Sequence, residues 1–149
     1  MRMLVKLCLP AALLLPALCF ARDVAIIAYK DNASSAVNSA DLVKLLKTDS
    51  PKWADGTKVV IILGDPGSLE SHLLLEKVLR VAPSEMAAFL AAHKNSITVL
   101  SSDDLVLKAV AAHPGAIGVV NVYSINSAVK VLRVDGKLPL EQGYLLHGN

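Results

Sequence analysis

Apolar runs of strand length alternate with amphipathic stretches along most of the chain. Residues 24–29 and 58–63 are almost entirely apolar, which is typical of strands that are buried on both faces. Between them, an apolar stripe over residues 42–46 predicts a helix that begins at the capping residue Ser39 and ends before Pro51. The predicted strands are residues 24–29, 58–63, 97–100, 116–122 and 129–134. The other predicted helices are residues 69–80, 83–93 and 103–112.

Apolar strands separated by helices predict a three-layer α/β/α fold with a mainly parallel or mixed sheet. From Asp135 onward the sequence turns polar, and the sequence leaves open whether residues 138–149 of this tail pack on the domain or extend from it. Sheets of this kind bind ligands beyond the carboxyl ends of their strands. We therefore expect the loops after Tyr29, Leu63 and Leu100, together with the turn at Gly115, to form one rim.

The first 21 residues have the pattern of a secretory signal peptide. Arg2 and Lys6 precede an uncharged run over residues 7–20, and Ala21 offers a small residue for cleavage. The run is too short for a transmembrane helix, so we expect no membrane insertion after cleavage. The predicted organisation is a signal peptide, 1–21, and one domain, 22–149, exported to a bacterial periplasm. Both cysteines lie in the signal peptide, so no disulfide is expected.

The charge balance and the polar residue types exclude several classes of function. Without Arg2 and Lys6 the chain has 13 basic and 13 acidic residues, so it lacks the basic surface that nucleic acid or an anionic membrane requires. The four histidines share no metal-ligand spacing, and we expect neither a metal nor another cofactor. No nucleophile motif of a hydrolase is present, and we expect no catalytic activity.

Several motifs in the expected order resemble one lobe of the phosphate-type periplasmic substrate-binding proteins of ABC transporters, a group with the type 2 periplasmic-binding fold. The most specific piece is Pro-Gly-Ala-Ile-Gly at residues 114–118, and a Trp-x-Asp-Gly turn lies at residues 53–56. The other matching segments are residues 28–32, 41–46, 129–136 and 143–144. The short secreted relatives of this family contain a single lobe, and the resemblance covers almost the whole of residues 22–149.

The resemblance implies a non-catalytic solute-binding protein with a small oxyanion at the N-terminus of the helix after the second strand. A helix N-terminus suits an anion because free N–H groups and the helix dipole converge there. The family has an arginine and a Ser-Gly-Thr run in this loop. Here Ser68 is kept, but Gly64 replaces the arginine, Leu69 the glycine and Glu70 the threonine.

The candidate ligand-binding residues are those of this loop and of the neighbouring loops on the expected rim. They are Gly67, Ser68, Leu69, Asn32, Ser34, Ser35, Ser101 and Ser102. Ser68 and Ser102 can also serve only as helix caps, and Asn32, Ser34 and Ser35 can simply form a turn. The alternative function is an interaction or accessory module of the cell envelope, acting as a homodimer or with another protein, that has lost the anion pocket.

Overall fold

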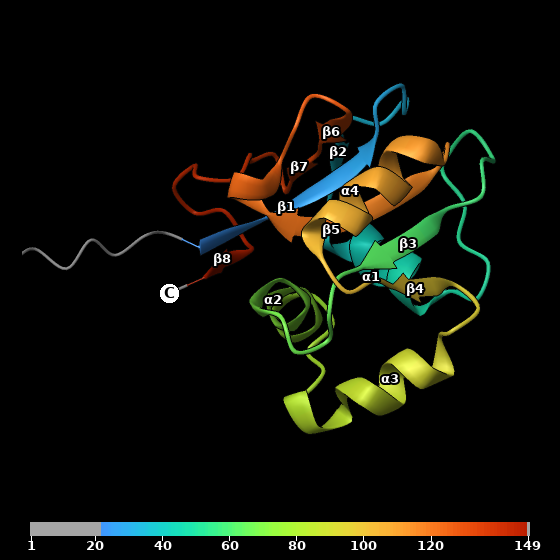
Figure 1. Ribbon diagram of the computed structural model, residues 1–149, viewed down its shortest axis with the longest axis vertical. Coiled ribbons are helices and arrows are strands. Elements are labelled where there is room, and N and C mark those ends of the chain that lie inside the picture. The colour runs from blue at the N-terminus through green and yellow to red at the C-terminus, as the bar shows by residue number, and fades with distance from the viewer. Residues whose placement is uncertain (1–21, 149) are drawn as a thin grey trace, which may run out of the picture.

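A six-stranded mixed sheet runs through the molecule in the order β4-β3-β5-β1-β6, with β8 paired to the start of β1 (Figure 1). The computed structural model describes residues 22–148, so the predicted signal peptide lies outside the described residues. The strands are β1 Arg22–Tyr29, β2 Ala36–Val37, β3 Val60–Leu63, β4 Ile97–Val99, β5 Ala116–Asn121, β6 Val129–Val131, β7 Arg133–Val134 and β8 His147–Gly148. The helices are α1 Ser39–Lys47, α2 Leu69–Lys77, α3 Met86–Ala92 and α4 Asp103–Ala112, with short 3-10 turns at Pro83–Glu85 and Val122–Ser124.

Strand direction divides the sheet into two parts. β3 is parallel to both β4 and β5, whereas β1 is antiparallel to β5, β6 and β8. The predicted α/β class is confirmed, and the sheet is mixed rather than mainly parallel. A run of apolar residues cannot separate the two cases, because any central strand covered on both faces shows the same pattern.

Helices cover both faces of the sheet, so the predicted three layers are present. Successive residues of β1 point to opposite faces. Val24 and Ile26 pack into the core that includes α1 and α2, whereas Ala25 and Ile27 pack against α4. Gly118 of β5 lets α4 lie close, because a Cβ there would come within 2.7 Å of the Val110 side chain.

Several helix ends differ from the sequence prediction. Asn38, not Ser39, caps α1, since its Oδ1 accepts a hydrogen bond from the Asp41 N–H at 2.7 Å. α2 ends at Lys77 rather than at Arg80. Arg80 has a positive φ of 57°, which lies outside the range of a right-handed α-helix. The predicted helix 83–93 begins as a 3-10 turn and becomes α-helical only at Met86.

The C-terminal segment packs back on the sheet rather than extending into solvent. Leu146 is fully buried, and β8 pairs with the first residues of β1. Tyr144 is also buried, and its hydroxyl donates a hydrogen bond to the Val24 carbonyl at 2.7 Å. Burial and the nearby Asp23 carboxylate raise the pKa of Tyr144 well above its ordinary value. Asp23, itself buried, accepts hydrogen bonds from the Leu140 N–H and the His147 ring.

This burial predicts that the C-terminal segment contributes to stability. Leu146→Ala should lower the free energy of unfolding by about 2–5 kcal/mol, because it opens a cavity beside β1. Leu140→Ala is the matched control, since Leu140 belongs to the same segment but is 58% exposed, and it should change stability by less than about 0.5 kcal/mol. Urea unfolding of both variants measures the difference. Equal effects would show that the segment does not pack as described.

Candidate functional site

The loop between β3 and α2 is held in shape by its own hydrogen bonds. Asp65 Oδ1 accepts from the Gly67 N–H at 2.7 Å, and the Ser68 N–H donates to the Asp65 carbonyl at 2.9 Å. Ser68 is the N-cap of α2, because its Oγ accepts from the Ser71 N–H at 3.2 Å. Ser71 is buried, and its hydroxyl donates to the Gly64 carbonyl at 3.2 Å. These hydrogen bonds fix the conformation of the backbone that leads into α2.

The first turn of α2 retains donors for a ligand. Within the described part of the chain, the N–H groups of Leu69 and Glu70 have no hydrogen-bond partner. The Ser68 hydroxyl accepts from Ser71 and can still donate its own proton. The positive end of the helix dipole adds to these donors. The three groups together could hold one small oxyanion.

Two carboxylates border the same helix end. Asp103, the first residue of α4, accepts through Oδ2 from the Asn121 N–H at 3.0 Å and the Ser124 hydroxyl at 2.7 Å. Its Oδ1 lies toward Gly64, 4.0 Å from the position that a Cβ there would take. Glu70 Oε1 accepts from the Asn121 side-chain amide at 3.2 Å. The network ties the end of β5 to the starts of α2 and α4.

Sequence reasoning missed Asp103 as a site residue. An acidic residue in the first turn of a helix is explained by the dipole alone, and nothing in the sequence shows which strand end it faces. The only signal in the sequence was that Asp103 directly follows the capping residue Ser102, which comes shortly after a predicted strand. The hydrogen bond to Asn121, 18 residues away, is a property of the fold.

The structure separates the sequence-predicted residues into two groups. Gly67, Ser68 and Leu69 lie on the loop after β3, and Ser101 and Ser102 lie on the loop after β4. Because β3 and β4 are parallel neighbours, these loops leave the same edge of the sheet. Ser102 caps α4 by accepting from the Leu105 N–H at 3.3 Å.

Asn32, Ser34 and Ser35 lie at the opposite edge, so the expected single rim is wrong. β1 runs antiparallel to β5, and the loop after Tyr29 therefore lies beside the turn at Gly115 that precedes β5. Asn32 and Ser34 form a local turn, since Asn32 Oδ1 accepts from the Ser34 N–H at 2.8 Å.

Trp53 occupies this second edge. Its indole N–H donates to the Gly115 carbonyl at 3.0 Å, which fixes the ring against the turn. Gly115 has a φ of +85°, and a Cβ there would lie 2.3 Å from the Lys58 carbonyl oxygen, so only glycine fits. The neighbouring Asp55 accepts a hydrogen bond from the Thr57 N–H, which lowers the pKa of its carboxyl group.

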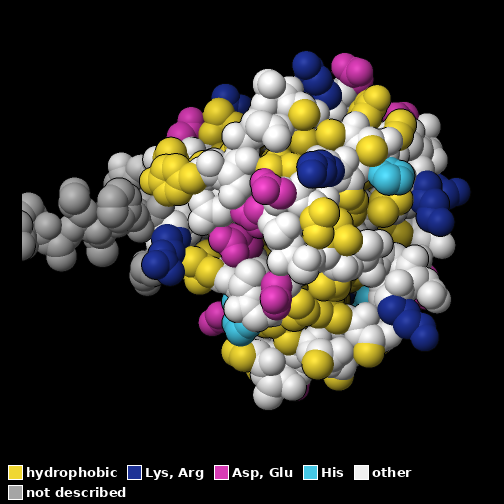
Figure 2. Space-filling model, viewed as in Figure 1, with side chains coloured by type: hydrophobic (Ala, Val, Ile, Leu, Met, Phe, Trp, Pro, Cys, Tyr) yellow, Lys and Arg dark blue, Asp and Glu magenta, His cyan; other side chains and the backbone are white. Residues whose placement is uncertain are grey.

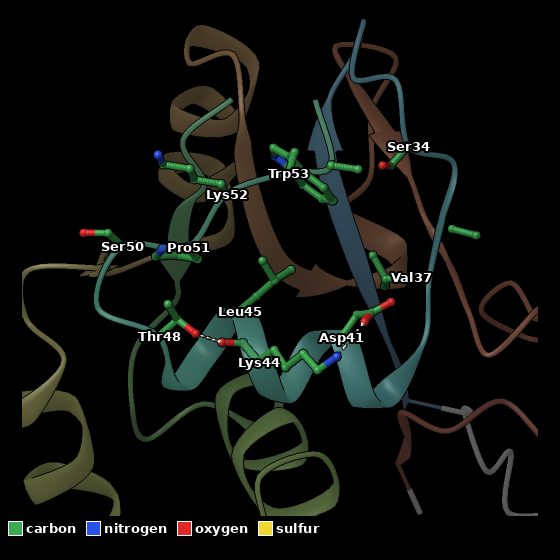
Figure 3. Close-up of a pocket in the computed structure, with 12 residues that line it drawn as sticks. Ser34, Val37, Asp41, Lys44, Leu45, Thr48, Ser50, Pro51, Lys52 and Trp53 are labelled. Atoms are coloured by element: carbon green, nitrogen blue, oxygen red, sulfur yellow. Dashed lines mark hydrogen bonds and ion pairs between the residues drawn. The ribbon is translucent and has the colours of Figure 1, made fainter. Parts of the chain in front are cut away.

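A groove of about 490 Å³ lies between α1 and the segment that carries Trp53 (Figure 3). Leu45 and the Trp53 ring supply its apolar surface, and Lys44 and Lys52 lie along its border (Figure 3). Lys44 forms an exposed ion pair with Asp41 at 3.9 Å. The candidate site is the N-terminus of α2, because unpartnered N–H groups and the Ser68 hydroxyl converge there.

Residues 22–148 contain neither a metal-binding cluster nor a membrane-spanning helix. No group of at least three His, Cys, Asp or Glu side chains there could hold a metal ion. None of the helices in this part of the chain is long and apolar enough to cross a membrane.

Comparison with known proteins identifies the fold through structure rather than sequence. No family model matches the sequence, and no curated protein matches it significantly. An ABC-type phosphate transport receptor from Vibrio cholerae matches with a TM-score of 0.69 and 15% identity, over 85% of this chain and 54% of its own. A phosphate ABC transporter substrate-binding protein from Clostridium perfringens, solved with bound phosphate, matches with a TM-score of 0.69 and 18% identity, over 85% of this chain and 53% of its own. PstS from Borrelia burgdorferi matches with a TM-score of 0.69 and 17% identity, over 87% of this chain and 55% of its own.

The chain thus spans about half the length of the solved structures that it matches. The predicted resemblance is confirmed at the level of the fold: the chain has the fold of a single lobe of the phosphate ABC transporter substrate-binding proteins.

Proposed function

We propose that this chain is a non-catalytic, secreted solute-binding protein of the phosphate transporter type that binds a small oxyanion at the N-terminus of α2. The observation that carries the proposal is the pair of unpartnered N–H groups at Leu69 and Glu70, beside the Ser68 hydroxyl. The fold supports it, because the structural neighbours from Vibrio cholerae and Clostridium perfringens are described as phosphate transport proteins.

The two carboxylates limit which oxyanion the site can take. A carboxylate about 4 Å from a bound anion costs about 4 kcal/mol at an effective dielectric constant near 20. That cost falls when the oxyanion keeps a proton, because its hydroxyl can donate a hydrogen bond to Asp103 Oδ1. Phosphate retains a proton at neutral pH, and sulfate does not. The proposed ligand class is therefore a protonated, phosphate-like oxyanion.

A second candidate function rests on a different observation at the same edge. The Tyr123 side chain is 66% exposed just after β5, beside the Asp103 network. An exposed aromatic side chain at this edge suits the alternative of an envelope interaction module. The absence of oxyanion binding would favour this alternative.

Thermal unfolding of residues 22–149 with oxyanions tests the proposed site. Phosphate should raise the melting temperature and sulfate should not, since a ligand in hundredfold excess over its Kd adds about 2.7 kcal/mol of stability.

Glu70→Gln should tighten phosphate binding about fivefold, because it removes a partly screened charge and keeps the acceptor for Asn121. Ser68→Ala should weaken phosphate binding by a similar factor.

Ser68→Ala also removes a helix cap, so a matched cap variant is needed. Asn38→Ala removes the cap of α1, which lies away from the α2 loop, and should lower stability by about 1 kcal/mol without changing phosphate affinity. If wild type gains no stability from phosphate, or if Asn38→Ala weakens binding as much as Ser68→Ala, the oxyanion site is wrong.

Export is tested separately. The full chain expressed in a Gram-negative host should appear in the periplasmic fraction with Arg22 as its first residue, as cleavage after Ala21 requires. Mass spectrometry of the intact protein distinguishes this product from the uncleaved chain. A cytoplasmic product that retains residues 1–21 would contradict the proposed secretion.

A further inference from the structure

Large apolar side chains are exposed at the edge of the sheet that carries the α2 N-terminus. Tyr123 is 66% exposed after β5, Leu105 is 42% exposed in the first turn of α4, and Val99 is 41% exposed at the end of β4. These positions lie at one edge because β3, β4 and β5 run in the same direction. Apolar side chains that are exposed together mark interaction surfaces, whereas single exposed ones are normal.

Acidic side chains surround these apolar ones. Asp103 and Asp104 lie in the first turn of α4, and Glu70 lies in the first turn of α2. Figure 2 shows Asp and Glu side chains gathered over the N-terminal ends of these two helices, next to hydrophobic ones. We call this surface, made of Glu70, Val99, Asp103, Asp104, Leu105 and Tyr123, the acidic edge.

Hydrogen bonds stabilise the backbone turn that carries Tyr123, the aromatic residue of the acidic edge. The Tyr123 N–H donates to Asn121 Oδ1 at 2.9 Å, and the next residue, Ser124, donates its hydroxyl to Asp103. Asn121 is bonded in turn to Glu70. The backbone that presents Tyr123 is therefore fixed before any partner binds, so little entropy is lost when the ring is covered.

We infer that the acidic edge is a docking surface for a cationic segment of another protein, in which lysine or arginine residues flank an apolar side chain. A basic partner neutralises the carboxylates, whereas nucleic acid or an anionic lipid surface is repelled by them. An exposed tyrosine carried on a fixed backbone is the kind of residue that supplies much of the binding energy at an interface. The inference goes beyond the proposed function and does not depend on it, because docking is measured without oxyanion.

Three synthetic peptides of about ten residues test the inference by fluorescence anisotropy. One alternates lysine with leucine, one alternates glutamate with leucine, and one alternates lysine with serine. The lysine–leucine peptide should bind about tenfold more tightly than either of the others, and its affinity should fall as salt is raised. Tyr123→Ala should weaken its binding about tenfold, and Asp104→Asn should weaken it about threefold.

Two matched variants separate docking from unspecific attraction. Leu140→Ser removes an exposed apolar side chain on the C-terminal segment, and Glu85→Gln removes an exposed carboxylate on the turn before α3. Both should bind the lysine–leucine peptide as wild type does. Equal losses in the control variants and the acidic-edge variants would overturn the inference. So would an unchanged affinity in Tyr123→Ala.

Discussion

The antiparallel placement of β1 between β5 and β6 is the constraint on which the rest of the structure depends. β1 pairs with β5 from Val24 to Ala28 and with β6 from Ile27 to Tyr29, and its residues from Val24 to Ala28 are fully buried. It therefore joins the two cores that lie on opposite faces of the sheet. Its direction also decides which loops meet, because the loop after β1 leaves the sheet at the edge away from the α2 N-terminus. The C-terminal segment completes this arrangement by covering the start of β1.

At the α2 N-terminus, a helix dipole and two carboxylates act against each other. Free N–H groups favour an anion, whereas Asp103 and Glu70 disfavour one. Both carboxylates are already bonded to Asn121, so their charges are held at the site rather than turned into solvent. A ligand must therefore satisfy donors and acceptors at once. A protonated oxyanion does this through its own hydroxyl, and a cationic protein segment does it by neutralising the carboxylates.

Local features of this fold could be predicted from the sequence, and long-range ones could not. The cap at Ser68 and the left-handed Gly115 each follow from a residue type and its immediate neighbours. Strand direction does not, because the apolar pattern of β1 is the same in either orientation. For this reason, the prediction that the loops after Tyr29, Leu63 and Leu100 form one rim was wrong. Asp103 and the buried Tyr144 were missed because their partners lie far along the chain, at Asn121 and Val24.

A phosphate titration of the isotope-labelled protein, followed by ¹H–¹⁵N correlation spectra, tests the proposed oxyanion site most directly. The proposed ligand lies at the first turn of α2, so the amide signals of Leu69 and Glu70 should shift most. The amides of Asn32, Ser34 and Ser35 should stay in place, because they lie at the opposite edge of the sheet. Shifts concentrated at these three residues, or no shifts at Leu69 and Glu70, would contradict oxyanion binding at the α2 N-terminus.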